Sequence, residues 1–216
     1  MKPNVKINGI SMDSLGWLRE SISFPPVASQ TDNVVIPGRN SPIRFSVINN
    51  RISYQPRTFK IVLVMLGNRT KFMEMESAIL QQFLGRLCKV TISEKPDLYV
   101  QGTLQLESDY DVDSHKGSLT IKCSDADAYF YHIDKTGKSF SGNQQAILPC
   151  DFMPTVPQIT VTEQTKLEWF IDQESFSKTL KKGTWTIPEL ELHQGENTIS
   201  ITTSGQVTFE YQEGCL

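Results

Sequence analysis

The sequence is poor in the residues on which most active sites and metal centres depend. It has three histidines and four cysteines among 216 residues, and no two cysteines have the close spacing of a metal-binding pair. Motifs for a nucleophilic serine, a zinc-binding helix or a phosphate-binding loop are absent as well. We therefore predict no catalytic residue, no metal site and no cofactor, and we expect the cysteines to be free, buried thiols.

The chain also lacks long hydrophobic runs and dense basic clusters. The longest apolar run, Ile61–Leu66, is far shorter than the roughly 20 residues of a membrane-spanning helix. No apolar stretch of signal-peptide length follows Met1. The 21 Lys and Arg residues are outnumbered by 24 Asp and Glu residues and are scattered along the chain. We expect a soluble protein, made in the cytoplasm and unprocessed at this end, without membrane insertion or specific nucleic-acid binding.

One acidic segment imitates the start of a calcium-binding loop. Asp109, Asp111 and Asp113 alternate as the first ligands of such a loop do. The loop also needs glycine at its sixth position and a bidentate glutamate at its twelfth, where this sequence has Ser114 and Thr120. We therefore interpret the segment as a solvated turn between two strands.

Short alternating segments separated by turn residues dominate the first part of the sequence, and they are typical of strands. The Asn8-Gly9 and Pro37-Gly38 pairs each predict a hairpin turn, the second flanked by apolar strands over Val34–Phe45. The run that ends at Leu66 is typical of a strand buried on both faces. The remaining strands are predicted over residues 17–24, 51–55, 88–93, 98–107 and 118–123.

A single long helix is predicted over Thr70–Leu87. Its apolar residues fall on one broad arc at 100° per residue, and Glu76 is the charged residue that projects into this arc. Asn68 or Thr70 can cap the first turn, and Gly85 is a suitable stop. We expect this helix to pack on a sheet through a structural core made of Phe72, Ile79, Leu80, Phe83, Leu84 and Leu87.

The composition changes near residue 136. Residues 1–136 carry 16 basic and 14 acidic residues, a net charge of +2, whereas residues 137–216 carry 5 and 10, a net charge of −5. The second part has only strand signals, at the regular spacing typical of a sandwich or jelly roll. We therefore predict a mainly β protein with two domains: residues 1–136, a β-sandwich or half-barrel that carries the helix, and residues 137–216, a β-sandwich.

Two tryptophans of the second domain allow a different function. An exposed indole can stack on a sugar ring, so Trp169 or Trp185 could serve a carbohydrate-binding module. Because strand residues flank both tryptophans, we expect them to lie in the core instead.

The order of several short motifs resembles the distal tail (Dit) proteins of long-tailed bacteriophages. An Ile-Asn-Gly turn near the start is followed by Val-Val-Ile-Pro-Gly-Arg, then by the helix and by Lys-Pro-Asp-Leu-Tyr-Val. The sequence departs from the family pattern at Asn40-Ser41, where Asp-Gly is usual, and at Ala126, where proline is frequent. The motifs that carry the resemblance are Ile7–Gly9, Val34–Arg39, Lys95–Val100, Gly117–Asp125, Gly195–Ile201 and Phe209–Tyr211.

The resemblance implies a structural role in a virion. Such proteins form a hexameric ring at the distal end of the tail, between the tail tube protein and the tail-associated spike or lysin protein. Receptor-binding proteins can attach at the rim, and DNA passes through the channel. The first domains would build the ring, and the second domains would be galectin-like in shape, without an implied sugar site.

If the chain forms such a ring, the apolar hairpin at Val34–Phe45 is a candidate contact between its subunits. Its strands are apolar in an otherwise polar region, and hairpins and strand edges are common contacts between subunits. The candidate interface residues are Val34, Ile36, Pro37, Gly38, Arg39 and Phe45. Two alternatives remain at this point: the carbohydrate-binding module, and another tail or baseplate component such as a tube-like protein.

Overall fold

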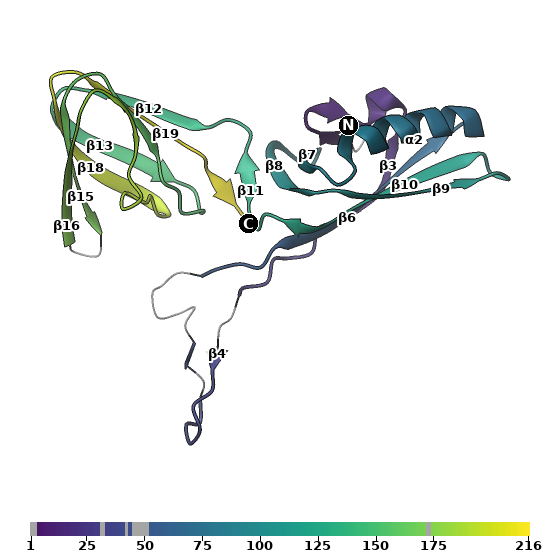
Figure 1. Cartoon of the computed structure of the whole chain (residues 1–216), viewed down its shortest axis with the longest axis horizontal. Helices are drawn as coiled ribbons and strands as arrows, with labels where there is room; N and C mark the ends of the chain where they lie inside the picture. Colours follow the sequence, from purple (N-terminus) through teal and green to yellow (C-terminus); the bar gives the residue numbers. More distant parts are fainter. Residues whose placement is uncertain (1–3, 31–32, 42, 45–51, 172–173) are drawn as a thin grey trace. The chain divides into compact units, whose positions relative to one another are not determined.

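The computed structural model describes residues 4–30, 33–41, 43–44, 52–171 and 174–216. The chain is mainly β, with a single α-helix in the described part, as predicted (Figure 1). It divides into two compact units, Met1–Phe130 and Tyr131–Leu216. The division therefore falls six residues before the predicted position.

The first unit is built around a four-stranded antiparallel sheet, called here the ring sheet. Its strands in spatial order are β3 (Leu18–Ser23), β6 (Arg57–Leu66), β10 (Lys116–Ala126) and β9 (Gln105–Asp111). One face is buried along its two central strands, with Ile61 and Leu63 on β6 beside Leu119 and Ile121 on β10. The intervening residues of these strands point to the opposite face, which we call the outer face.

The prediction that β6 is buried on both faces is wrong. Val62 and Val64 on its outer face are only half-buried, and Leu66 is 73% exposed. No second layer of the described chain covers this face, so the apolar run alternates in burial like an ordinary half-buried strand.

A second group of strands lies in the order β2 (Ile10–Ser11), β1 (Val5–Ile7), β7 (Leu87–Ile92) and β8 (Lys95–Thr103). Asn8 and Gly9 link β1 to β2 with φ values of 50° and 82°. Two successive positive φ values define the tight turn expected of an Asn-Gly hairpin, so the predicted turn is confirmed. A short 3₁₀ turn, η1 (Asp13–Leu15), follows β2.

The predicted helix is confirmed as α2 (Arg69–Phe83). The Asn68 side chain caps it by accepting from the backbone N–H of Lys71 at 2.9 Å. Phe72, Ile79 and Phe83 are buried, as predicted. The helix ends one turn earlier than predicted.

The early end of the helix corrects two of the predicted core residues, and a third is less buried than predicted. Leu84 already has an extended backbone, with φ −60° and ψ 124°, so the helical periodicity no longer applies beyond Phe83. Leu84 is 46% exposed and Leu87, which begins β7, is 63% exposed. Leu80, still within the helix, is half-buried.

The helix lies directly on β10 because Gly117 has no side chain. A Cβ atom on Gly117 would lie 2.1 Å from the Phe72 ring. That ring is also flanked by Trp17 and Tyr110, with centroids 5.9 Å and 5.2 Å away. Glu76, the charged residue in the apolar arc, accepts a hydrogen bond from the Ser108 hydroxyl at the edge strand β9.

The second unit is a sandwich of two four-stranded antiparallel sheets. One sheet has the order β12 (Thr136–Ser141), β19 (Gln206–Tyr211), β14 (Gln158–Val161), β17 (Gly183–Thr186). The other has the order β13 (Gln144–Cys150), β18 (Gly195–Thr203), β15 (Thr165–Ile171), β16 (Glu174–Leu180). Large side chains of both sheets fill one core, among them Leu148, Leu167, Trp169, Ile201 and Phe209.

Two short strands, β11 (Phe130–His132) and β20 (Gly214–Cys215), lie near the unit boundary. The backbone N–H of His132 donates to the Glu213 carbonyl at 3.0 Å, and the Gln212 side chain donates to the His132 carbonyl at 2.7 Å. The Thr136 hydroxyl donates to the Glu213 carboxylate. Gln212 and Glu213 thus hold the segment with which the second unit begins.

Candidate assembly surfaces

The described residues between β3 and β6, which are 24–30, 33–41, 43–44 and 52–56, form a two-stranded extension that we call the arm. Near its base, the N–H of Gln55 donates to the Ala28 carbonyl at 2.9 Å, and the N–H of Gln30 donates to the Ser53 carbonyl at 2.7 Å. Farther out, β4 (Asn33–Val34) pairs with β5 (Ile43–Arg44) in antiparallel register. The predicted hairpin is therefore confirmed over its described residues, and Phe45 lies outside them.

The arm ends in the turn that the Pro-Gly pair predicts. The N–H of Arg39 donates to the carbonyl of Ile36 at 3.1 Å, closing a four-residue turn. Gly38 has a φ of 83°, the left-handed conformation that a type II turn requires at its third residue, and Pro37 suits the fixed φ of the second. The tip is thus a defined turn that presents its neighbouring side chains in fixed directions.

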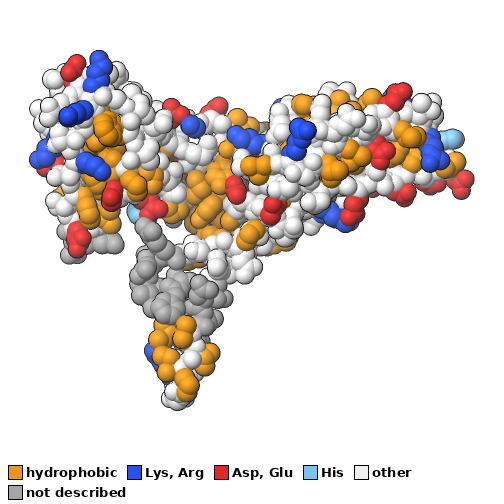
Figure 2. Space-filling model, in the orientation of Figure 1, with side chains coloured by type: hydrophobic (Ala, Val, Ile, Leu, Met, Phe, Trp, Pro, Cys, Tyr) orange, Lys and Arg blue, Asp and Glu red, His pale blue; other side chains and the backbone are white. Residues whose placement is uncertain are grey.

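Hydrophobic side chains at the tip of the arm have no cover. Val34, Val35 and Ile36 are 47%, 76% and 41% exposed. Figure 2 shows hydrophobic atoms gathered at this end of the arm. Single exposed apolar residues are common on protein surfaces, but a contiguous apolar group is typical of an interaction site. The sequence prediction singled out Val34 and Ile36 but missed Val35, which is the most exposed of the three.

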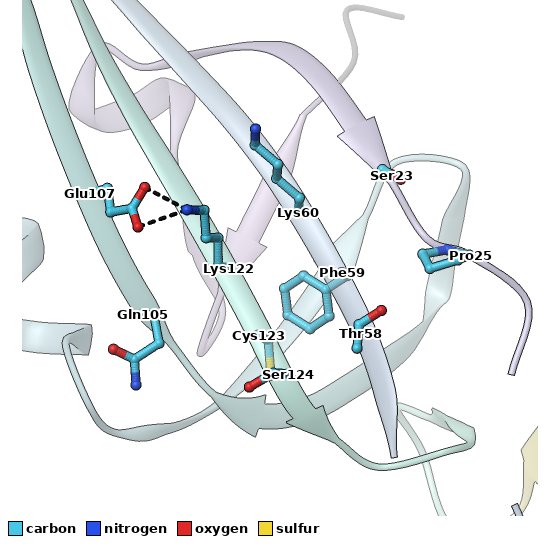
Figure 3. A pocket seen from close by; sticks show the side chains of 10 residues that line it. All are labelled: Ser23, Pro25, Thr58, Phe59, Lys60, Gln105, Glu107, Lys122, Cys123 and Ser124. Atoms are coloured by element: carbon cyan, nitrogen blue, oxygen red, sulfur yellow. Dashed lines mark hydrogen bonds and ion pairs between the residues drawn. The ribbon is translucent and has the colours of Figure 1, made fainter. Parts of the chain in front are cut away.

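The outer face of the ring sheet has a shallow hollow of about 490 Å³ (Figure 3). Lys122 donates to both carboxylate oxygens of Glu107, at 2.7 and 2.6 Å, whereas Lys60 forms no ion pair in the described part of the chain. Burial raises the pKa of the Cys123 thiol to about 11, so this side chain is protonated near neutral pH and is a poor nucleophile. The hollow is lined by Ser23, Pro25, Thr58, Phe59, Lys60, Gln105, Glu107, Lys122, Cys123 and Ser124.

The acidic segment runs from the last residues of β9 into the turn that follows, so the predicted turn is confirmed only from Val112 on. The Asp111 carboxylate accepts from the Ser114 hydroxyl at 2.6 Å and from the Asp113 N–H at 3.0 Å. The first of these hydrogen bonds is the main reason why the pKa of Asp111 is lowered. No group of three or more His, Cys, Asp or Glu side chains that could hold a metal ion occurs in the described ranges.

The two tryptophans of the second unit differ. Trp169 is buried, donates to the Glu189 carbonyl at 3.3 Å and stacks on Phe176, so the core prediction is confirmed for it. Trp185 is 41% exposed, and its indole donates to the Lys181 carbonyl at 2.8 Å. The core prediction is wrong for Trp185: it lies opposite the buried Ile159, but β17 is the edge strand of its sheet, so the indole is only partly covered.

The described residues include no helix that is both long and apolar enough to cross a membrane. The cysteines Cys88, Cys123 and Cys150 are free and buried as predicted, and Cys215 is free and half-buried.

Comparisons with known proteins place the fold. No protein-family model matches the sequence, and no curated protein matches it. Among solved structures, the chain is similar to the Dit protein (gp 19.1) of phage SPP1, described as a paradigm of the hub adsorption apparatus in phages that infect Gram-positive bacteria. The similarity covers 100% of each chain, with a TM-score of 0.69 and 12% sequence identity. The chain therefore has the fold of a phage distal tail protein over its whole length.

Proposed function

We propose that this chain is a structural protein of a phage tail tip, located in the virion at the distal end of the tail. Six copies form a ring that joins the tail tube protein to the tail-associated spike or lysin protein. Receptor-binding proteins attach at the rim, and DNA passes through the channel at ejection. The observation that carries this proposal is the full-length similarity to SPP1 Dit, a hub protein.

The arm supports the assembly part of the proposal. Val34 and Ile36 are apolar and exposed, and the Pro37-Gly38 turn fixes the tip that carries Arg39. In a monomer these apolar side chains stay in water, whereas a neighbouring subunit would remove them from it at a gain of roughly 25 cal/mol per Å². We assign the arm to the contact between adjacent copies.

The experiment that tests the hub function is the mass of the purified chain, measured by light scattering after size exclusion. A species near six times the 24.4 kDa chain, seen as single rings by electron microscopy, is the expected result. A protein that stays monomeric at high concentration and in the presence of the tube protein would contradict the proposal.

The role of the arm is tested by Ile36→Asp. A charge at the tip is expected to shift the protein from ring to monomer, because an unpaired carboxylate would be desolvated in the contact. Ile147→Asp is the matched control, since Ile147 is a similarly exposed isoleucine, at 48%, in the second unit. If Ile36→Asp assembles as well as Ile147→Asp, the arm is not part of the ring contact.

A carbohydrate-binding module is the second candidate function, and the exposed indole of Trp185 is the observation that favours it. Binding of a glycan by the isolated monomer, lost in Trp185→Ala, would support this candidate over the hub. A tube-like tail protein is distinguished by its assembly, because it would stack into long tubes instead of closing into one ring layer.

A further inference from the structure

Two aromatic pairs join the base of the arm to residues 128–130, the last residues of the first unit, which we call the boundary segment. Phe24, the first residue of the arm, has its ring centroid 5.7 Å from that of Phe130. Tyr54, on the returning strand of the arm, contacts Tyr129 edge to face, with centroids 5.8 Å apart. Aromatic pairs at such distances attract each other beyond the effect of the area that they bury. Both strands of the arm therefore hold the boundary segment.

The boundary segment is also held from the start of β6. Arg57 is only 5% exposed, and its Nε and Nη2 donate to the Ala128 carbonyl at 3.2 and 2.9 Å. The guanidinium carbon of Arg57 lies 4.5 Å from the centre of the Phe130 ring, and the Lys95 ammonium lies 4.0 Å from the same point. Such cation contacts are strongest where water is excluded, and Phe130 is buried. The boundary segment is thus fixed by side chains beyond the end of β10.

The base of the arm is ordered by its own contacts. Two backbone hydrogen bonds, one on each side of the Ser29–Tyr54 bridge, join its outgoing and returning strands. Phe24 stacks on the buried ring of Phe59 in β6, with centroids 4.9 Å apart and an interplanar angle of 19°. The arm base and the boundary segment therefore belong to one contiguous set of contacts, and such sets can carry energetic coupling between their members.

The second unit begins directly after these contacts. The N–H of Asp127 donates to the Gln101 carbonyl at 2.8 Å, just before the boundary segment. The N–H of His132 donates to the Glu213 carbonyl at 3.0 Å, just after it. We call these two N–H groups the boundary amides. Because they flank the boundary segment, their hydrogen exchange reports how firmly the arm base holds it.

We propose that the base of the arm is a clamp on the boundary segment, and that docking of the arm on a neighbouring copy reduces the motion of the chain where the second unit begins. Docking restricts the arm, and restriction of one member of a packed set lowers the entropic cost of ordering the others. The clamp is a property of the single chain, whereas its response to docking rests on the proposed function.

Hydrogen exchange of the free chain tests the clamp. Tyr54→Ala removes the ring that contacts Tyr129, and Tyr54→Phe is the matched control because it keeps that ring. Tyr54→Ala is expected to speed exchange of both boundary amides by about fivefold or more, whereas Tyr54→Phe should leave them near the wild-type rate. The reference is the hydrogen-bonded amide of Gly67, just beyond the other end of β6, whose exchange should not change.

Two results would overturn the clamp. Unchanged exchange of the boundary amides in Tyr54→Ala would show that the contact does not hold the boundary segment. An equal acceleration at Gly67 would show a general loss of stability instead of a local release. Tyr129→Ala provides an independent measurement, because coupling is reciprocal: it should speed exchange of the Gln55 amide in the arm. Unchanged exchange at Gln55 would also contradict the clamp, and this variant decides the matter if Tyr54→Ala does not fold.

A comparison of assembled and monomeric protein separates the clamp from the hub function. In wild-type assemblies the boundary amides are expected to exchange more slowly than in monomeric Ile36→Asp, by about fivefold or more. Assemblies of Tyr54→Ala, which keeps the tip of the arm, should lose this protection. If assemblies form and show no protection, or if Tyr54→Ala keeps it, the response to docking is wrong and the hub function stands. If the wild-type chain never assembles, the hub function and the response to docking both fail, and the free chain still decides the clamp.

Discussion

Replacing Gly117 by alanine tests how the helix is joined to the ring sheet. The new methyl carbon would lie 2.1 Å from Cδ2 and 2.5 Å from Cε2 of Phe72. Carbon atoms prefer separations of about 3.5 Å or more, so the ring has to move by about 1.4 Å. Phe72 is only 4% exposed and its ring contacts Trp17 and Tyr110, so these neighbours have to move with it.

The expected loss of stability follows from this geometry. Overpacking of a well-packed core typically costs about 1–3 kcal/mol. Alanine also restricts the unfolded chain, which offsets about 0.4–1 kcal/mol of that cost. We therefore expect Gly117→Ala to lower the free energy of unfolding of the first unit by about 1–2 kcal/mol. The assay is unfolding in urea, measured by circular dichroism and by tryptophan fluorescence, to which Trp17 beside Phe72 contributes.

A matched control is available at Gly137, an exposed residue of strand β12. Neither glycine has a positive φ, and a Cβ on Gly137 meets no atom within 4 Å. Gly137→Ala should leave the stability unchanged or raise it slightly. Phe72→Leu combined with Gly117→Ala should cost less than the sum of the two single changes, because the smaller side chain relieves the clash. A loss below about 0.5 kcal/mol in Gly117→Ala, or strict additivity, would refute the packing argument.

Three further predictions concern the same unit. Phe83→Ala should cost about 3–5 kcal/mol because its ring is buried, whereas the neighbouring Leu84→Ala should cost less than about 1 kcal/mol; similar losses in chemical unfolding would contradict the assigned end of the helix. Asn68→Ala should cost about 1 kcal/mol by the same assay, because the first turn loses its cap, and an unchanged midpoint would argue against the cap. Hydrogen bonds from Arg19 lower the pKa of Glu94 from 4.5 to about 2, so the stability from this pair is present above about pH 4.5 and is lost as the pH falls towards 2. Arg19→Ala should therefore flatten the acid limb of the stability profile, and an identical limb would show that the pair contributes nothing.

Local patterns in the sequence predicted the elements well where a short segment decides the structure. Asn68 caps the helix and Pro37-Gly38 forms its turn because both effects need only a few neighbouring residues. The prediction failed at the end of the helix, where Gly85 marks the stop but the apolar spacing continues to Leu87. Leu84 and Leu87 continue the apolar spacing of the helix, but the backbone leaves the helix at Leu84 and turns at Gly85, whose φ is 66°, so both side chains are exposed.

Properties that depend on distant strands could not be read from the sequence. Trp169 and Trp185 are both flanked by strand residues, and only the sheet order places one in the core and the other at an edge. The apolar residues on the outer face of the first sheet are of the same kind. Leu18 and Val64 become neighbours only through the register of β3 on β6, which no local motif specifies.

The way in which the second unit begins has a consequence for synthesis of the protein. Thr136 is bound by Glu213, which is 77 positions further along the chain, and β12 is held in its sheet by β19. A ribosome must therefore add almost the whole second unit before its first strand finds a partner. The strands of the ring sheet, by contrast, are all translated by Ala126. The first unit can complete its sheet while the second is still being made, so contacts between nascent copies through the first unit need not wait for the second.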